Sequence, residues 1–230
     1  WIMNPYDEFA VEEALKLKAA VSESTVTVLR VGATHDTEAL RTAMAMGADD
    51  SFLVESDDNL DSYSIAKALK GAIEKSGKTP DIIFAGKQAI DDDCLQVPQL
   101  LAQMLDLPSV SMVTGFEYAD GNCTLKREIE GGAIEVYNVT GATMVACNKG
   151  LNTPRYASLP GIMKAKKKPL TNLTLADVGV TDDDRRIRYS NFERPPEKPP
   201  GKKFDATDEA QQASIVKEVV SLLRTEAKVI

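Results

Sequence analysis

Apolar positions along the first part of the chain follow two different spacings. Short runs rich in β-branched and apolar residues predict buried strands, at residues 25–31, 51–54, 81–85 and 143–147. Stretches in which apolar residues recur every three or four positions predict helices with one buried face, at residues 5–18, 36–46, 63–76 and 94–105. Because strands that alternate with helices form βαβ units, the pattern predicts an α/β fold with an open, mostly parallel, doubly wound sheet.

The pattern changes after residue 105. Residues 109–118 and 122–130 predict two strands, and a third strand is expected at residues 133–139. Gly131 and Gly132 lie between the second and third of them and predict a two-residue turn. We therefore expect an antiparallel hairpin appended to the parallel sheet and not a second domain.

The last part of the chain departs from both spacings. Residues 151–169 show no sustained period and predict a long exposed loop, whereas the proline-rich stretch Arg194–Gly201 predicts an extended arm. Residues 208–228 predict a helix with one apolar stripe, which needs its own domain or a partner chain to pack on. We therefore divide the chain into an α/β domain at residues 1–188 and an arm with a helix at 189–230.

Composition narrows the class of protein. The chain has 230 residues, a hydrophobic fraction of 43% and a net charge of −8. These values fit a globular protein and argue against general nucleic-acid binding, because no basic surface dominates. No apolar run reaches the length of a membrane span. Three widely spaced cysteines without a C-x-x-C pair predict a reducing compartment and no metal cluster. His35 is the single histidine, and we expect it to lie at the surface.

The candidate site follows the third predicted strand. The strand ends at Gly86, a polar loop comes next, and a helix is expected from Cys94, with Asp93 as its N-cap and Pro98 in its first turn. In open α/β sheets, a strand, a glycine, a loop and a helix N-terminus form the place where nucleotides bind. The order of these elements therefore predicts a candidate nucleotide site.

The same loop contains three consecutive carboxylates, Asp91, Asp92 and Asp93. They would repel a phosphate, and they equally suit a solvated loop that complements the dipole of the following helix. The residue pattern alone leaves both interpretations open.

Three longer stretches carry a family resemblance: Met3–Ala14, Gly86–Asp93 and Leu151–Lys168. Each resembles the corresponding segment of the electron transfer flavoprotein beta subunit, and they occur in that family's order. The resemblance covers the chain from Trp1 to about Gly179. It implies a fold similar to the adenine-nucleotide alpha-hydrolases, in which the centre of the sheet is a strand and hairpin that would precede Trp1.

The resemblance also implies a function. Proteins of this family are heterodimers in which the alpha subunit holds most of an FAD and the beta subunit holds a structural AMP. The flavin takes electrons from flavin dehydrogenases, such as the acyl-CoA dehydrogenases of fatty acid oxidation, and passes them to a quinone oxidoreductase. Because the cofactor does the chemistry, the resemblance implies an electron carrier without a catalytic side chain. The implied compartment is the bacterial cytoplasm or, alternatively, the mitochondrial matrix.

Sixteen cofactor-binding residues are implied by matching these stretches to the family. Tyr6 matches an aromatic residue that lies beside the flavin, and Leu151 matches the anchor of a loop that docks on the dehydrogenase. The implied cofactor-binding residues are Asn4, Pro5, Tyr6, Asp7, Val31, Gly86, Lys87, Gln88, Ala89, Ile90, Asp91, Asp92, Asp93, Cys94, Gln96 and Val97.

Two positions depart from the family pattern. Leu95 and Val97 stand where most AMP-binding members have Asn and Thr, so two side-chain donors for the phosphate are lost. The pair Gln96–Val97 is similar to the electron-bifurcating branch of the family, in which a second FAD replaces AMP. A further alternative is a stand-alone adenine-nucleotide-binding regulator of a related fold, although such a sensor has no need of a docking loop at 151–168.

Overall fold

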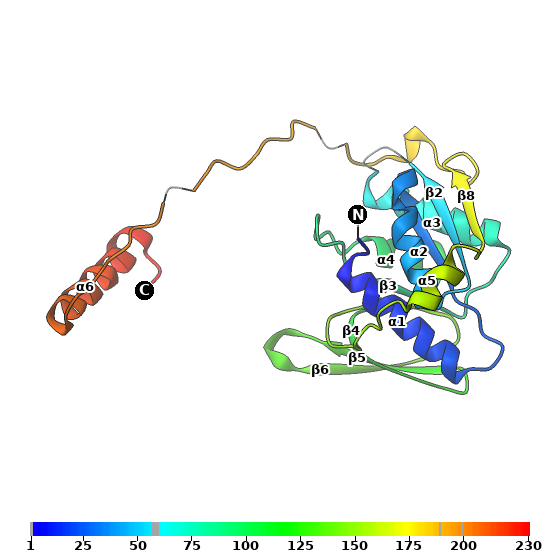
Figure 1. Ribbon diagram of the computed structural model, residues 1–230, viewed down its shortest axis with the longest axis horizontal. Helices are drawn as coiled ribbons and strands as arrows, with labels where there is room; N and C mark the ends of the chain where they lie inside the picture. The colour runs from blue at the N-terminus through cyan, green and yellow to red at the C-terminus, as the bar shows by residue number, and fades with distance from the viewer. Residues whose placement is uncertain (1, 57–59, 189, 199) are drawn as a thin grey trace. The chain divides into compact units, whose positions relative to one another are not determined.

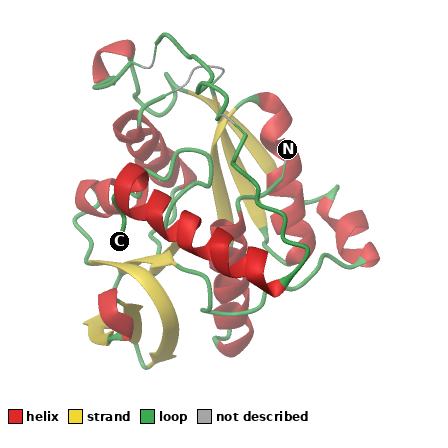
Figure 2. Ribbon diagram, turned by 90° about the vertical axis from the view of Figure 1, so that its left-hand side faces the viewer, coloured by secondary structure: helices red, strands yellow, loops and turns green. Residues whose placement is uncertain are grey.

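The computed structural model describes residues 2–56, 60–188, 190–198 and 200–230. The chain forms two compact units, Trp1–Tyr189 and Ser190–Ile230. The larger unit has α/β architecture, with helices on both sides of its parallel strands (Figures 1 and 2). This agrees with the open α/β fold that the spacing of apolar residues predicts.

Within the described residues of the larger unit, eight strands form two sheets. The first sheet is parallel and has the order β1-β2-β8, with β1 at Thr27–Gly32, β2 at Asp50–Glu55 and β8 at Leu170–Thr174. The second has the order β3-β7-β4-β5-β6, with β3 at Ile82–Gly86, β7 at Thr143–Cys147, β4 at Ser109–Ala119, β5 at Asn122–Glu128 and β6 at Ile134–Thr140. β3, β7 and β4 pair in parallel, whereas β4, β5 and β6 pair antiparallel, so the expected hairpin is present.

In the part of this unit that the structure describes, five α-helices cover these strands. They are α1 at Pro5–Ala20, α2 at Thr37–Met46, α3 at Ser62–Ser76, α4 at Val97–Met104 and α5 at Leu159–Ala165. α3 shows how the sequence sets their bounds: the Asp61 side chain accepts a hydrogen bond from the Ser64 amide at 2.9 Å, and Gly77 ends the helix with a left-handed φ of 66°.

Successive side chains of β1 and of β3 point to opposite faces of the strand, and helices cover both faces. Val28 of β1 packs with α1 and α2, whereas Leu29 packs with α3. On β3, Phe84 packs against α1 residues, and Ile83 packs against α3 and α4. Both faces of each strand are therefore apolar, as expected for parallel strands covered on both sides.

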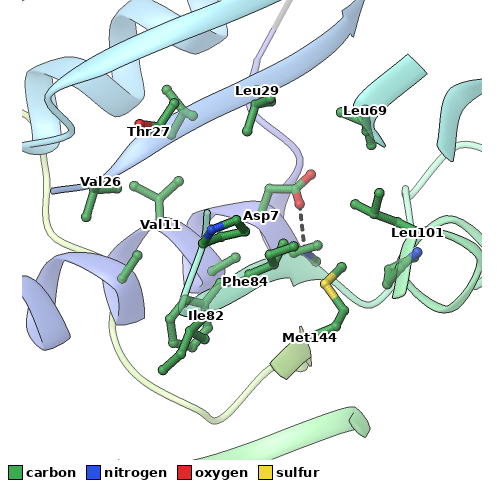
Figure 3. A pocket seen from close by; sticks show the side chains of 18 of the residues that line it. Asp7, Val11, Val26, Thr27, Leu29, Leu69, Ile82, Phe84, Leu101 and Met144 are labelled. Atoms are coloured by element: carbon green, nitrogen blue, oxygen red, sulfur yellow. Dashed lines mark hydrogen bonds between the residues drawn. The ribbon is translucent and has the colours of Figure 1, made fainter. Parts of the chain in front are cut away.

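A cleft separates the two sheets. The strands therefore do not form the single sheet that the pattern predicts. Among the described residues, β1 pairs only with β2 and β3 pairs only with β7. Side chains of both strands line the cleft between them, including Leu29 from β1 and Ile82 and Phe84 from β3 (Figure 3). The free backbone edges of β1 and β3 explain why all six residues of β1 and the first four residues of β3 remain partly accessible.

Three local expectations are corrected. α4 begins at Val97, not at Cys94, because Asp93 and Leu95 adopt left-handed φ values of 50° and 54° that interrupt a helix. Asp93 is consequently not the N-cap, although Pro98 does lie in the first turn as expected. The turn between β5 and β6 spans five residues with a 3₁₀ segment at Glu130–Gly132, instead of two glycines.

The stretch expected to be an irregular loop contains a helix and is followed by an unpredicted strand. α5 starts where the Ser158 side chain accepts a hydrogen bond from the Gly161 amide at 3.1 Å, with Pro160 in the first turn. Leu170–Thr174 then forms β8 as the third strand of the first sheet. Both elements are short, so neither completes a recognisable hydrophobic period.

The smaller unit is simple. α6 at Glu209–Leu222 is capped by Asp208, whose side chain accepts from the Gln211 amide at 2.9 Å, and a π-helical turn at Leu223–Ala227 follows. No described residue of α6 is buried. Among the described residues of the whole chain, no helix is long and apolar enough to cross a membrane.

Candidate functional site

The cleft has a volume of about 650 Å³ and runs along β1 and β3 to their carboxyl ends. At that end the N-terminus of α1, the loop after β3 and the start of α4 meet. Away from that end the cleft is lined mainly by apolar side chains, among them Val26, Leu69 and Met144 (Figure 3). Cofactor and nucleotide sites in α/β proteins lie at the carboxyl ends of parallel strands, so this end is the candidate site.

The N-terminus of α1 is fixed to the end of β3 by side-chain hydrogen bonds. The Gly86 amide donates to Asp7 Oδ1 at 2.7 Å (Figure 3). Asn4 Nδ2 donates to Gln88 O at 2.9 Å and to Asp7 Oδ2 at 3.0 Å. A carboxylate that accepts a backbone N–H forms a stronger bond than a neutral acceptor does. This network closes one side of the cleft.

Gly86 allows that closure. A Cβ at this position would lie 2.7 Å from the Tyr6 Cβ and 2.8 Å from Asp7 Oδ1, both shorter than real contacts. Only glycine therefore permits α1 to lie so close to the strand end. The Lys87 amino group in turn lies 4.9 Å from the centre of the Tyr6 ring, a cation–π contact.

The loop before α4 is acidic and largely exposed. The Cys94 amide donates to Asp92 Oδ1 at 3.1 Å, and the Gln88 side chain bonds Asp93. Desolvation and the neighbouring charge of Asp92 raise the pKa of the Cys94 thiol. Cys94 is therefore a poor nucleophile at neutral pH.

Most of the implied cofactor-binding residues line the cleft, but some do not. Pro5, Tyr6, Ile90, Asp91 and Asp93 lie outside its lining. The structure brings together the following residues at the cleft: Asn4, Asp7, Val31, Gly86, Lys87, Gln88, Ala89, Asp92, Cys94, Gln96 and Val97.

Arg30 is a lining residue that the sequence analysis missed. It is the third residue from the end of β1, and its guanidinium lies 3.0 Å from the carboxylate of buried Asp36. With Lys87, it adds positive charge to a site that also contains Asp7 and Asp92. The available signal was a single charged residue inside an otherwise apolar strand. Among the described residues, no group of His, Cys, Asp and Glu is arranged to hold a metal ion.

The docking residue implied by resemblance lies away from the cleft. Leu151 follows β7, is partly buried and packs against the core cluster that contains Val113 and Leu125. The polar and glycine- or proline-bounded neighbours of Leu151 in the sequence predict a side chain that points outward and contributes little to the core; its packing against this cluster shows that expectation to be wrong. Large apolar side chains that are exposed in this region include Tyr156 and Leu159, at 98% and 75% accessibility, together with Ile162 and Met163 of α5.

Comparison with known proteins gives a consistent family. The model of the electron transfer flavoprotein domain matches residues 1–178. The chain is 42% identical over 235 residues to the electron transfer flavoprotein subunit beta of Bacillus subtilis, covering 100% of this chain and 88% of that protein. It is 39% identical over 228 residues to the subunit beta of Bradyrhizobium diazoefficiens, covering 99% and 86%. For the mitochondrial subunit beta of Arabidopsis thaliana, the identity is 39% over 209 residues, covering 90% and 82%.

Proposed function

Because this chain belongs to the electron transfer flavoprotein family, among its beta subunits, we propose that it holds an AMP at the carboxyl end of the cleft and completes the FAD site of an alpha subunit. Membership makes the chain a flavin-associated electron carrier with an alpha-subunit partner. The carrier takes electrons from flavin dehydrogenases such as acyl-CoA dehydrogenases and delivers them to a quinone oxidoreductase.

The observation that carries the nucleotide proposal is the network around Asn4. Asn4 donates to Gln88 O at 2.9 Å, yet its buried Oδ1 has no hydrogen-bond partner among the described residues. An unpaired buried acceptor is costly, and the amino group or ribose hydroxyls of an adenine nucleotide would satisfy it. The residues at this end of the cleft therefore fit the group.

The phosphate end relies on backbone donors. Leu95 has a left-handed φ of 54°, and Gln96 follows with φ −107° and ψ −40°. This alternation of left- and right-handed conformations points successive amides in one direction and forms an anion-binding concavity. The first-turn amides of α4 lie directly after it. These groups replace the side-chain donors that Leu95 and Val97 lack.

The protein's own role is to position the cofactor and to shield it from solvent. A bound flavin would supply the electron-carrying chemistry. Tyr6, on the first turn of α1, would then lie on the side of the cleft that meets the alpha subunit. The segment after β7, from Leu151 through α5, would dock on the dehydrogenase, and the smaller unit would pack on the alpha subunit, because no residue of α6 is buried within the chain.

We also propose that the apolar part of the cleft receives one further parallel strand, as in the adenine-nucleotide alpha-hydrolase type of fold. β1 and β3 each pair with a neighbour on one side only, within the part of the chain that is described. Backbone N–H and C=O groups next to apolar side chains need partners. One inserted strand would supply partners for both edges and would join the two sheets.

Nucleotide release from the purified heterodimer tests the function. After denaturation, we expect one FAD and about one AMP per dimer, as measured by chromatography against standards. Two FAD and no AMP would favour the bifurcating type, which the pair Gln96–Val97 resembles. FAD without any second nucleotide would overturn the nucleotide site, and a chain that purifies alone and colourless would favour the stand-alone regulator.

A further inference from the structure

Two adjacent carboxylates on α1, Glu12 and Glu13, are buried, with accessibilities of 6% and 4%. They lie on the helix whose N-terminus closes the cleft, but they have no part in the cleft itself. Buried carboxylates are costly unless they are paired and hydrogen-bonded. Their partners therefore indicate what they hold in place.

Among the described residues, all but one of the partners of the two carboxylates come from the segment after β7. Arg155 Nε donates to Glu12 Oε2 at 2.7 Å, Nη2 donates to Oε1 at 2.9 Å, and the Arg155 amide donates to Oε2 at 3.1 Å. Asn152 Nδ2 donates to Glu13 Oε2 at 2.8 Å and to Phe9 O at 2.9 Å. The exception is Lys16 on α1, whose Nζ lies 3.2 Å from Glu13 Oε2. Residues 152–155 are thus fixed to one turn of α1.

The fork of Arg155 gives this attachment a defined geometry. A bidentate guanidinium–carboxylate pair fixes orientation as well as distance. Burial opposes ionisation of Glu12, but the hydrogen bonds from the Arg155 side chain and amide outweigh it and lower the pKa of Glu12. The pair is therefore charged at neutral pH.

The other end of the segment is anchored independently, on α2. Arg41 Nη1 donates to Ala165 O at 2.6 Å and to Lys168 O at 2.9 Å. α5 lies so close to α2 that a Cβ on Gly161 would be 2.4 Å from Ala45 O. Between the two anchors lie the exposed Tyr156 and Leu159. An exposed apolar surface held at both ends is pre-organised for a partner.

We propose that Glu12 and Glu13 are positioning residues that hold residues 152–155, and with them Tyr156 and Leu159, in the conformation that a partner dehydrogenase binds. The inference rests on the proposed docking function of this segment. α1 is a single rigid helix, so it also fixes the distance between the docking segment and the cofactor end of the cleft, where Asn4 and Asp7 lie.

The expected size of the effect follows from the fraction of molecules in the binding-competent conformation. If loss of the Glu12 charge leaves the segment ordered in about a tenth of the molecules, the apparent affinity for the partner falls about tenfold. The maximal rate of electron transfer stays unchanged, because a bound complex has the same geometry. A change in half-saturation without a change in maximal rate separates positioning from a general loss of structure.

The test uses the purified heterodimer with Glu12→Gln, in which one acceptor oxygen remains where three donors of Arg155 converge. Arg155→Lys is the second variant, since it keeps the charge and loses the fork. Glu74→Gln is the matched control, because Glu74 is a helical carboxylate in an exposed ion pair with Lys70. Flavin content and thermal unfolding confirm that each variant is folded.

Two measurements are made on each variant. The first is hydrogen exchange of residues 151–158, in which both test variants should lose protection at the Arg155 amide about tenfold. The second is flavin reduction by an acyl-CoA dehydrogenase and its acyl-CoA substrate, in which half-saturation should rise about tenfold at an unchanged maximal rate. The control should match wild type in both measurements.

Unchanged exchange in Glu12→Gln and Arg155→Lys would overturn the inference, whichever dehydrogenase is used. Lost protection with unchanged half-saturation would also overturn it, provided that Leu159→Ala raises half-saturation. If Leu159→Ala and Tyr156→Ala have no effect either, it is the proposed docking function of the segment that fails.

Discussion

Replacing Gly86 by alanine should open the closed end of the cleft. The added Cβ would lie 2.7 Å from the Tyr6 Cβ, and ordinary contacts begin at 3.4 Å, so α1 has to retreat from β3 by roughly 0.7 Å. The obstacle on α1 is backbone and Cβ, which cannot rotate away. The strand end is held by its pairing with β7, so the helix is the part that moves.

The cost follows from the bonds that this retreat stretches. The Gly86 N to Asp7 Oδ1 distance is 2.7 Å, and the Asn4 Nδ2 to Gln88 O distance is 2.9 Å. Both would approach or pass the limit of a hydrogen bond. Overpacking costs about 1–3 kcal/mol, each weakened bond about 1 kcal/mol, and alanine regains about 0.5–1 kcal/mol over glycine in a strand. We expect a net loss of about 2–4.5 kcal/mol in the free energy of unfolding.

Thermal unfolding and nucleotide content of the heterodimer measure the effect. For a domain of this size the melting temperature should fall by roughly 4–18 °C, and AMP content should fall with it because Asn4 is displaced. Gly115→Ala is the matched control: it is also a strand glycine, but its Cβ would lie 3.0–3.3 Å from atoms of the Lys126 side chain, so the neighbour has to give by only a few tenths of an ångström. A Gly86→Ala protein with wild-type melting temperature and full AMP content would refute the reasoning.

Two further predictions concern the junction with the arm and the arm itself. Asp61 accepts from the amides of Arg186 and Ile187 at 2.6 and 2.9 Å; burial opposes its ionisation, but these bonds and those from Ser64 lower its pKa. The stabilisation by ionised Asp61 is therefore complete above the usual aspartate pKa of 3.8, and it is lost as the pH falls through the lower folded-state pKa. Acid unfolding should consequently lose this component below pH 3.8 in wild type but not in Asp61→Asn. Deleting residues 190–230 should leave the melting temperature of the α/β unit nearly unchanged and weaken heterodimer association in analytical ultracentrifugation; a truncated chain that unfolds but still binds the alpha subunit would contradict this.

Much of the fold was predictable from the sequence where local signals are complete. α3 has a capping aspartate, three apolar turns and a C-terminal glycine, and it forms where the pattern places it. α4 shows the opposite case. Apolar spacing alone predicts a start at Cys94, but the left-handed conformations of Asp93 and Leu95 depend on how the loop packs at the end of β3. Spacing does not contain that tertiary information.

The candidate site divides in the same way. The loop after Gly86 was recognisable from strand, glycine and helix order, because these are consecutive in the chain. The role of Glu12 was not, since its partner Arg155 lies 143 positions away, and no periodicity links the two. The partial burial of Leu151 was also missed, because its neighbours in sequence are polar while its neighbours in space belong to the core.

The order of the strands has a consequence for how the chain folds. β1 and β2 are complete by residue 55, yet the third strand of their sheet, β8, begins at residue 170. All five strands of the second sheet lie between them, so that sheet is inserted within the first. The first sheet can gain its outer strand only after the second has been synthesised, and closing so long a loop is slow. During synthesis β1 and β2 therefore remain a two-stranded pair until β8 is added. Substitutions in β8 should affect the yield of folding more than they affect the structure of the finished cleft.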